Sequence, residues 1–393
     1  MSAESTGYDA ARITVLEGRE AIRKRPGMYI GSTTVRGLHQ LVLDEVGRAV
    51  KASLAGRDGR GGKVEVTLTS DGGVRVTDDG PGVPFEDCGK SGAPGLETLL
   101  TRWFGRAGHE RHDRSTVFMA PWTGESSVTN ALSSRLTAEV RREGVRRVQE
   151  FARGVALAPP ADAGPVTGSG TTLTFRPDPE VFDTVEYVFA VLAARLAELA
   201  FLNPGLDLVL TDERSPDGPQ RARFRFPGGV GEFVTFLDAQ AGEWFIPDVI
   251  AFEREDPRMA GGMDVALAWS GTHEERIRSF VNSLATHNGG THETGLREGI
   301  AVAVDVYARA HGLLTAADPA LRADHVGADL TAVVSVKLDD PELTDCTRRT
   351  LGNTAVRACV AEAVREHLGA WLEEHPREAE GIVDRILRSP VRD

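Results

Sequence analysis

The spacing of apolar residues predicts one well-defined helix near the start of the chain. Between residues 38 and 55 apolar positions recur at helical intervals, and Gly56 follows as a plausible end of the helix. Residues 63–82 then alternate between apolar and polar positions around an Asp-Gly-Gly turn, which predicts two strands joined as a hairpin. The second strand runs into an acidic, glycine-rich loop at Asp78. Because glycines let a ligand approach the backbone, this loop is a candidate site.

The patterns after this loop add more strands and a second helix to the same unit. Residues 136–154 repeat the strand-turn-strand pattern, and residues 171–178 form another alternating strand. Residues 186–200 have the spacing of a strong helix. We therefore predict one α+β unit with a layered sheet for the first part of the chain.

A second series of strands and helices follows a polar stretch near residue 222. It contains the apolar runs DVALAW and TAVVSVKL and ends in a long helical pattern from Thr354 to Ser389. We therefore predict two α+β domains, and we expect the small, polar residues before the first domain's fold to form a flexible arm. The predicted parts are an arm of residues 1–12 within a first domain of residues 1–222, and a second domain of residues 223–393.

Charge and composition narrow the classes of function. The net charge is −13 at pH 7, which argues against a broad basic surface for DNA phosphates, so any contact with DNA is expected to be indirect. The three cysteines are widely spaced without a Cys-x-x-Cys pair, which disfavours a disulfide framework and a zinc site. The chain has neither an apolar signal segment nor a run of about 18 apolar residues. We expect a cytoplasmic protein without membrane contact.

Seven motifs occur in an order and spacing that resemble those of the DNA gyrase B family. They are RKRPGMYIGS, GLHQLV, DDGPGVP, VTNALSSRL, FLNPG, THNGGTHETG and TLGN. The resemblance covers nearly the whole chain. It implies a GHKL (Bergerat-type) ATPase domain, an α/β sandwich with helices on one face of a mixed sheet, followed by a transducer domain of the ribosomal S5 domain 2-like fold. It also implies an ATP-gated homodimer, with Tyr8 in the arm that crosses to the partner protomer; the alternative is a tail tyrosine without this role.

The first helix departs from the family at two positions. The family carries there a glutamate that activates the attacking water and, four residues later, an asparagine that holds magnesium; the matching residues are Asp44 and Arg48. The resemblance thus implies that Asp44 is a weakened general base. A guanidinium cannot ligate a cation, so we expect no metal ligand at Arg48, which disfavours Mg²⁺. Arg48 either binds nucleotide phosphate directly or forms an i,i+4 ion pair with Asp44. We expect the pair, which would lower the pKa of Asp44.

The positions that face adenine in the family match this sequence more closely. Asp78 matches the carboxylate that the family uses for the adenine amino group; the alternative is that it only caps its own loop. Arg142 matches the arginine that contacts coumarin inhibitors. These matches imply ATP or ADP as ligand and allow a coumarin-type inhibitor. Four further residues are candidates for nucleotide binding: Gly80, Gly82, Pro84 and Thr171.

The segment that should surround the triphosphate is altered. The family has a GxHGxG loop whose backbone amides bind phosphate. The aligned residues 120–125 contain one glycine, Gly124, while Pro121 has no amide hydrogen and Glu125 adds a negative charge. Tight triphosphate binding is therefore disfavoured, unless the Arg and His residues of segment 105–117 supply cations instead.

The second domain carries one further candidate for catalysis. The family has there a Gln-x-Lys element whose lysine reaches the γ-phosphate. The matching residues are Cys346, Thr347 and Arg348. The resemblance therefore implies a cation at Arg348 but no glutamine to orient the attack.

Three functions remain open for this chain. We favour a gyrase-B-like ATP-binding and dimerisation module with weak or absent ATP hydrolysis, lacking the DNA-cleaving TOPRIM half, because no EGDS or PLRGK motif occurs. The second is a pseudo-ATPase interaction or inhibitor-binding protein that modulates gyrase subunits or gives tolerance to coumarins. The third is an ATP-hydrolysing topoisomerase subunit that works with a separate cleavage subunit. Whether the chain is an enzyme stays open at this point.

Overall fold

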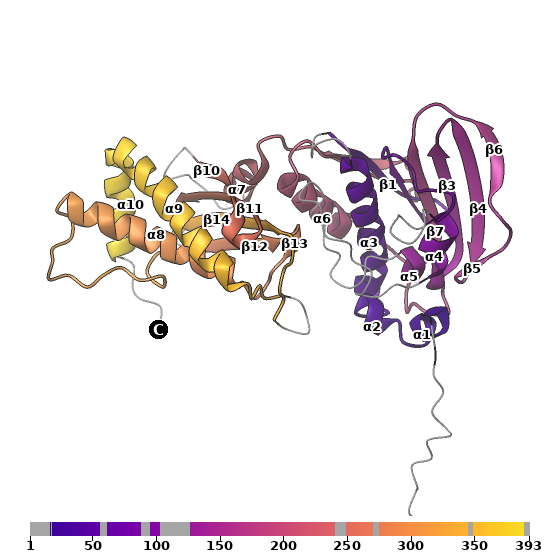
Figure 1. Cartoon of the computed structure of the whole chain (residues 1–393), viewed down its shortest axis with the longest axis horizontal. Coiled ribbons are helices and arrows are strands. Elements are labelled where there is room, and N and C mark those ends of the chain that lie inside the picture. The colour runs from indigo at the N-terminus through magenta and orange to yellow at the C-terminus, as the bar shows by residue number, and fades with distance from the viewer. Residues whose placement is uncertain are drawn as a thin grey trace, which may run out of the picture.

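Two sheets, each covered by its own helices, follow one another along the long axis of the molecule (Figure 1). Both are α+β units, as the hydrophobic pattern predicts. The computed structural model describes residue 16 and residues 18–55, 61–87, 95–102, 126–239, 249–269, 275–344 and 349–388.

The sheet of the first unit is mixed. Its strand order is β5-β4-β3-β7-β2-β1-β8-β9, and β6 pairs with β4. β1 runs parallel to β8, whereas its other neighbour, β2, is antiparallel. The predicted hairpins are present as β1–β2 and β3–β4. The strands are β1 (Lys63–Leu68), β2 (Val74–Asp78), β3 (Ser133–Arg142), β4 (Val145–Ala152), β5 (Val155–Ala156), β6 (Ala161–Pro165), β7 (Gly170–Pro177), β8 (Asp207–Asp212) and β9 (Gln220–Phe224).

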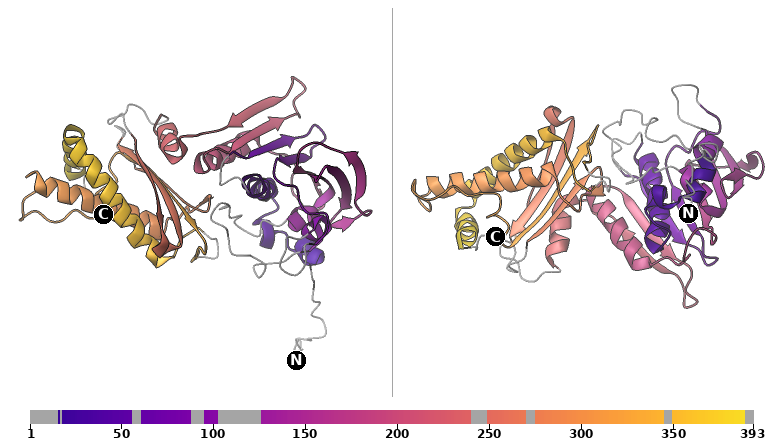
Figure 2. Two further views of the ribbon diagram at one scale, coloured as in Figure 1. Left: turned by 45° about the horizontal axis from the view of Figure 1, so that its top comes forward. Right: turned by 90° about the horizontal axis from the view of Figure 1, so that it is seen from below.

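The helices of the first unit lie against one face of this sheet (Figure 2). The longest of them, α3, buries Leu38, Leu41, Val42 and Val46 against strand residues such as Val76. This confirms the predicted helix, which begins three residues before the periodic pattern does. The helices are α1 (Gly18–Lys24), α2 (Gly27–Ile30), α3 (Val35–Leu54), α4 (Leu96–Thr101), α5 (Ser126–Ala131) and α6 (Phe189–Leu202).

Two interior strands of the sheet in the second unit, β11 and β14, are buried on both faces. The strand order of this sheet is β10-β11-β14-β12-β13. Along β11, Val265 and Leu267 face a core shared with α8 and α9, while Ala266 and Ala268 face α7. The elements are α7 (Gly229–Ala239), β10 (Ile250–Asp256), the 3-10 turn η3 (Pro257–Met259), β11 (Gly261–Trp269), β12 (Arg276–Val281), β13 (Leu284–Ala285), α8 (Thr291–Ala310), β14 (Leu330–Leu338), α9 (Thr354–Glu374) and α10 (Pro376–Arg388).

The long C-terminal helical pattern is two helices and not one. α9 ends at Glu374, His375 leaves the helical conformation with φ −127° and ψ 62°, and α10 begins at Pro376. Proline has no amide hydrogen for the preceding turn and fits the first position of a new helix. Apolar periodicity alone does not register this break. Among the residues that the structure describes, no helix is both long and apolar enough to cross a membrane.

An apolar cluster joins the two units. Phe201 at the end of α6 stacks on Phe226 and Phe233, with ring centroids 3.7 and 4.7 Å apart. Beside this cluster, Arg195 Nη2 donates to the backbone oxygen of Ser283 at 3.0 Å. β9 still belongs to the first sheet and ends at Phe224, and α7 begins the second unit. The predicted boundary near residue 222 thus falls within the last strand of the first sheet.

Candidate functional site

The loop after β2 holds the carboxylate that the sequence assigns to adenine. Asp78, the last residue of β2, has a fully buried side chain. Its Oδ1 atom accepts hydrogen bonds from the backbone amides of Gly80 and Thr171, at 3.0 and 3.2 Å. Thr171 Oγ1 accepts from the amide of Val83 at 3.1 Å. The loop-capping contact considered as the alternative is therefore present, and it fixes the orientation of the carboxylate.

The guanidinium of Arg48 extends from α3 to this carboxylate. Arg48 Nη1 donates to Asp78 Oδ2 at 3.0 Å, and Arg48 Nε donates to Glu45 Oε2 at 3.1 Å. Burial acts to lower the pKa of Arg48, but Asp78 and Glu45 outweigh it and raise the pKa, so the charge is retained. The expected ion pair with Asp44 is wrong. The long side chain instead reaches Glu45, three residues earlier on the same helix, and Asp78, which the fold brings next to α3.

Asp44 has a different environment from the one expected. Its side chain is buried, and its Oδ1 accepts from Gln40 Nε2 at 2.7 Å. Burial raises the pKa of Asp44 to about 8; the hydrogen bond from Gln40 opposes this shift, and the nearby Glu45 adds to it. The expected lowering of the pKa is therefore wrong. A carboxyl group that is mostly protonated at neutral pH cannot take a proton from water.

Glu45 is a site residue that the sequence reasoning missed. Its side chain is 1% exposed, and its Oε2 accepts from Ser126 Oγ at 3.0 Å as well as from Arg48. Among the described residues, neither Glu45 Oε1 nor Arg48 Nη2 has a hydrogen-bond partner, although both atoms are buried. The available signal was the i,i+3 spacing of Glu45 and Arg48, which is as favourable on a helix as the i,i+4 spacing of Asp44 and Arg48.

The remaining base-side candidates are also brought together. Gly82 has φ +79°, and a Cβ atom there would lie 2.6 Å from the backbone oxygen of Arg141, so a side chain would not fit. Arg142 Nη1 donates to the backbone oxygen of Gly82 at 2.9 Å. The backbone oxygen of Pro84 accepts from the amide of Leu96 at 2.9 Å. These contacts hold the loop after β2 against β3 and α4.

Three predicted site residues lie outside the described residues. They are Tyr8 in the arm, Gly124 in the segment aligned with the phosphate loop, and Arg348 in the second domain.

The donor set does not fit a magnesium ion. Arg48 stands where the metal ligand is expected and can only donate hydrogen bonds. Within the described residues, no group of three or more His, Cys, Asp or Glu is arranged to hold a metal. In the same arrangement, Asp78 Oδ2, an oxygen of the carboxylate expected to bind the adenine amino group, accepts a hydrogen bond from Arg48.

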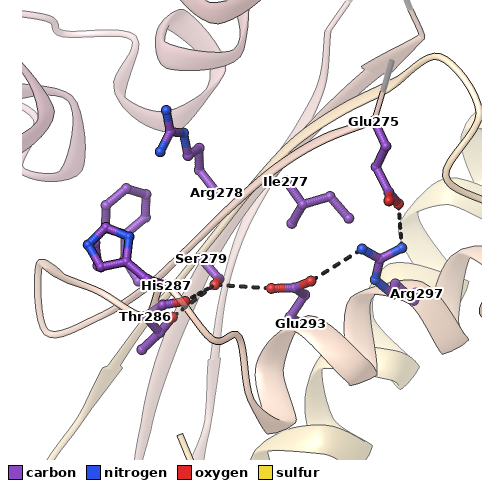
Figure 3. Close-up of a pocket in the computed structure, with 10 residues that line it drawn as sticks. Glu275, Ile277, Arg278, Ser279, Thr286, His287, Glu293 and Arg297 are labelled. Atoms are coloured by element: carbon purple, nitrogen blue, oxygen red, sulfur yellow. Dashed lines mark hydrogen bonds and ion pairs between the residues drawn. The ribbon is translucent and has the colours of Figure 1, made fainter. Parts of the chain in front are cut away.

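A cavity of about 280 Å³ lies in the second domain, between β12 and the start of α8 (Figure 3). A chain of polar side chains lines it: Thr286 Oγ1 donates to Ser279 Oγ at 2.8 Å, Ser279 Oγ donates to Glu293 Oε2 at 3.2 Å, and Arg297 links Glu293 to Glu275. None of the residues that line this cavity is a predicted site residue.

The motif THNGGTHETG serves structure in this region. His292 is fully buried, and its Nε2 lies 3.0 Å from Thr286 Oγ1. Burial lowers the pKa of His292 to about 3, so the imidazole is neutral at ordinary pH. Gly290 has φ +141°, and a Cβ atom there would lie 2.5 Å from the backbone nitrogen of Leu351. The motif thus starts α8 and packs the chain tightly at that point.

Known proteins resemble this chain over almost all of its length. The family model described as DNA gyrase B matches residues 229–391. The DNA gyrase B protein of Streptomyces coelicolor is 40% identical over 401 residues, covering 98% of this chain and 58% of that relative. The novobiocin-resistant DNA gyrase B protein of Streptomyces niveus is also 40% identical, over 400 residues and with the same coverage. The chain thus spans just over half the length of these relatives.

A solved structure covers the same region as this chain. The 43K ATPase domain of Thermus thermophilus gyrase B, in complex with an aminocoumarin, superposes with a TM-score of 0.79 at 31% identity. The match covers 97% of this chain and 96% of that domain. At 40% identity over 98% of its length, the chain belongs to the DNA gyrase B family, as a homologue of its ATPase and transducer region.

Proposed function

We propose that this chain is a gyrase-B-like ATP-binding and dimerisation module in which ATP hydrolysis is weak or absent. The observation that carries the proposal is the buried contact of Arg48 with Asp78 and Glu45, beside a protonated Asp44. Hydrolysis of ATP needs a base for water and a metal or other cations for the transferred phosphoryl group. Both requirements are impaired on α3, the base at Asp44 and the metal ligand at Arg48. Action together with gyrase subunits, and indirect contact with DNA, belong to this proposal.

The test is ATP turnover measured beside the corresponding region of the Streptomyces coelicolor relative. We expect turnover at least about 100-fold lower than in that control, because a displaced or protonated base has an effect of this order. As a base, Asp44 has a side chain one methylene shorter than the glutamate of the family and a raised pKa. Assays at pH 7 and pH 9 separate these two defects, because the carboxyl ionises across this interval. Equal turnover of the two proteins at pH 7 would favour the ATP-hydrolysing topoisomerase subunit and contradict the proposal.

Dimerisation through residues 1–12 is part of the same proposal. Tyr8 matches the arm position of the family, so nucleotide-driven association should depend on this arm. Sedimentation with a non-hydrolysable ATP analogue is expected to show a dimer that is lost on deletion of residues 1–12, with Tyr8→Ala intermediate. Association that is unchanged by the deletion would remove the arm from the proposal.

Inhibitor binding is a second candidate function. Arg142 keeps 30% of its side chain exposed while its Nη1 is anchored to the backbone oxygen of Gly82. The Thermus thermophilus domain binds an aminocoumarin, so we propose that this chain takes the same class of ligand. Calorimetry with an aminocoumarin should detect binding that Arg142→Ala weakens, whereas Arg146→Ala, on the neighbouring strand, should leave it unchanged. Equal binding by the three proteins would contradict a role of Arg142.

A further inference from the structure

The Asp78 carboxylate has its hydrogen bonds supplied from within the protein. Two backbone amides bond to Oδ1, and the Arg48 guanidinium bonds to Oδ2. The Asp78 side chain is 0% exposed and that of Arg48 is 11% exposed, so Arg48 closes the carboxylate off. An amino group of a base approaching Oδ2 would meet a positive charge in place of a free acceptor.

Glu45 and Ser126 keep Arg48 in this position. Glu45 accepts from Arg48 Nε, which aims the guanidinium across the gap between α3 and β2. Ser126, the first residue of α5, donates to the same oxygen of Glu45 and so orients the carboxylate. Glu45 thus acts through Arg48 and is a positioning residue.

We propose that Glu45 and Arg48 form an internal lock on Asp78, in which Arg48 takes the place of a base amino group and adenine nucleotides bind only when it is displaced. The lock rests on the proposed function in one respect: it assumes that the adenine of the nucleotide binds beside Asp78. It goes beyond that function because it makes Arg48 and Glu45 determinants of affinity for the base.

The group attached to carbon 6 of a purine shows whether Arg48 still covers Asp78, because ATP and ITP differ there. ATP carries an amino group there, which can donate a hydrogen bond to Asp78 once Arg48 has left this carboxylate. Inosine triphosphate (ITP) carries a carbonyl oxygen there, which an ionised carboxylate repels. Release of Asp78 should therefore increase the affinity for ATP more than that for ITP. A change that only creates space would increase both.

The test compares four versions of the whole chain by calorimetry with ATP and with ITP, each with magnesium and with EDTA. Beside the wild type, the main variant is the double substitution Glu45→Gln with Arg48→Asn, which removes one negative and one positive charge together and so keeps the charge of the site. Glu45→Gln alone weakens only the hold on Arg48. Asp78→Asn in the doubly substituted background is the control, because an amide cannot replace the ionised acceptor.

In EDTA, where the asparagine at position 48 cannot act through magnesium, we expect the double variant to bind ATP about tenfold to 100-fold more tightly than the wild type, with a clearly smaller gain or none for ITP. Glu45→Gln should show a smaller gain for ATP alone, and Asp78→Asn should abolish the gain. Wild-type protein that already prefers ATP to ITP as strongly as the double variant would overturn the lock, as would equal gains for both nucleotides. If the double variant does not fold, an unchanged ATP to ITP ratio in Glu45→Gln overturns the lock.

Turnover measured on the same samples separates this inference from the proposed function. Tight binding of ATP by the wild type without hydrolysis overturns the lock and leaves the proposed function standing. Hydrolysis of ATP by the wild type, together with a selective gain of ATP affinity in the double variant, overturns the proposed function and supports the lock.

Discussion

Two buried polar groups, one in each domain, differ in the kind of polarity that they bury. In the Arg48 cluster (Asp44, Glu45, Arg48 and Asp78), the guanidinium of Arg48 on α3 pairs with the carboxylates of Glu45 and Asp78. The Thr286 cluster (Ser279, Thr286, His292 and Glu293) consists mainly of hydroxyls and a neutral imidazole. Ser279, Thr286 and Glu293 line the cavity of the second domain (Figure 3), and the buried His292 bonds to Thr286.

The difference in buried charge predicts how strongly the stability of each domain depends on its cluster. Hydroxyls and a neutral imidazole can be buried at modest cost once they bond to one another. A buried cation and two carboxylates need partners on every side, and each partner removed leaves a charge uncompensated. The Arg48 cluster should therefore respond more strongly to single substitutions than the Thr286 cluster.

The largest effect is expected from removing the cation of the Arg48 cluster. Arg48→Met leaves Glu45 and Asp78 without their shared partner, and we expect a loss of about 3–5 kcal/mol in the free energy of unfolding. Urea denaturation measures this loss. Adding Glu45→Gln to Arg48→Met should recover part of it, because one uncompensated charge disappears. A loss no greater than that of Thr286→Val would contradict the contrast between the clusters.

Thr286→Val should have a smaller effect on the second domain. The substitution keeps the shape of the side chain but leaves Ser279 and His292 without the hydroxyl that bonds to both. The expected loss is about 1–3 kcal/mol in the free energy of unfolding. Thr235→Val is the matched control, since the exposed Thr235 hydroxyl bonds only to the helix backbone. Its effect should stay within about 0.5 kcal/mol.

The two clusters should also respond to pH in opposite directions. Asp44 has a pKa of about 8 when folded against 3.8 ordinarily, so between these values the folded state holds a proton that the unfolded chain has released. This contribution to stability is present below pH 4 and is lost as pH rises through 8. His292 has a pKa of about 3 against 6.5 ordinarily, so its contribution is lost as pH falls from 6.5.

Between pH 6.5 and 8 only the shift of Asp44 acts, among these two groups. We expect the wild type to lose up to about 2 kcal/mol of unfolding free energy over this interval relative to Asp44→Asn, measured by urea denaturation at both pH values. Parallel pH profiles of the two proteins would show that Asp44 is ionised in the folded state.

The smallest effect is expected from restoring the family's residues on α3 alone. Asp44→Glu combined with Arg48→Asn should raise ATP turnover less than tenfold, because residues 120–125 still lack the glycines that present amides to phosphate. Replacing residues 120–125 with GLHGVG in the repaired background should give the larger gain. Turnover at the level of the Streptomyces coelicolor control after the helix repair alone would mean that the Arg48 cluster by itself had silenced the site.

The sequence by itself determined the elements and the family. Apolar periodicity placed α3 and the β1–β2 hairpin, and the glycine-rich loop located Asp78 at the end of a strand. These inferences succeed because they depend on neighbours along the chain, whose spacing fixes which side chains share a face. The same locality explains the error at the C-terminus, where periodicity continued across His375 although the backbone did not.

Only the tertiary structure decided the partners of Arg48. Spacing on the helix allowed both Asp44 and Glu45, and the folded protein pairs Arg48 with Glu45 and with Asp78. Asp78 lies 30 residues further along the chain, so its distance from Arg48 depends on how α3 packs against β2. The raised pKa of Asp44 follows the same rule, because burial in the folded protein causes the shift from the ordinary value of an aspartate. Charges separated in sequence interact according to their distance and solvent exposure in space, and packing sets both.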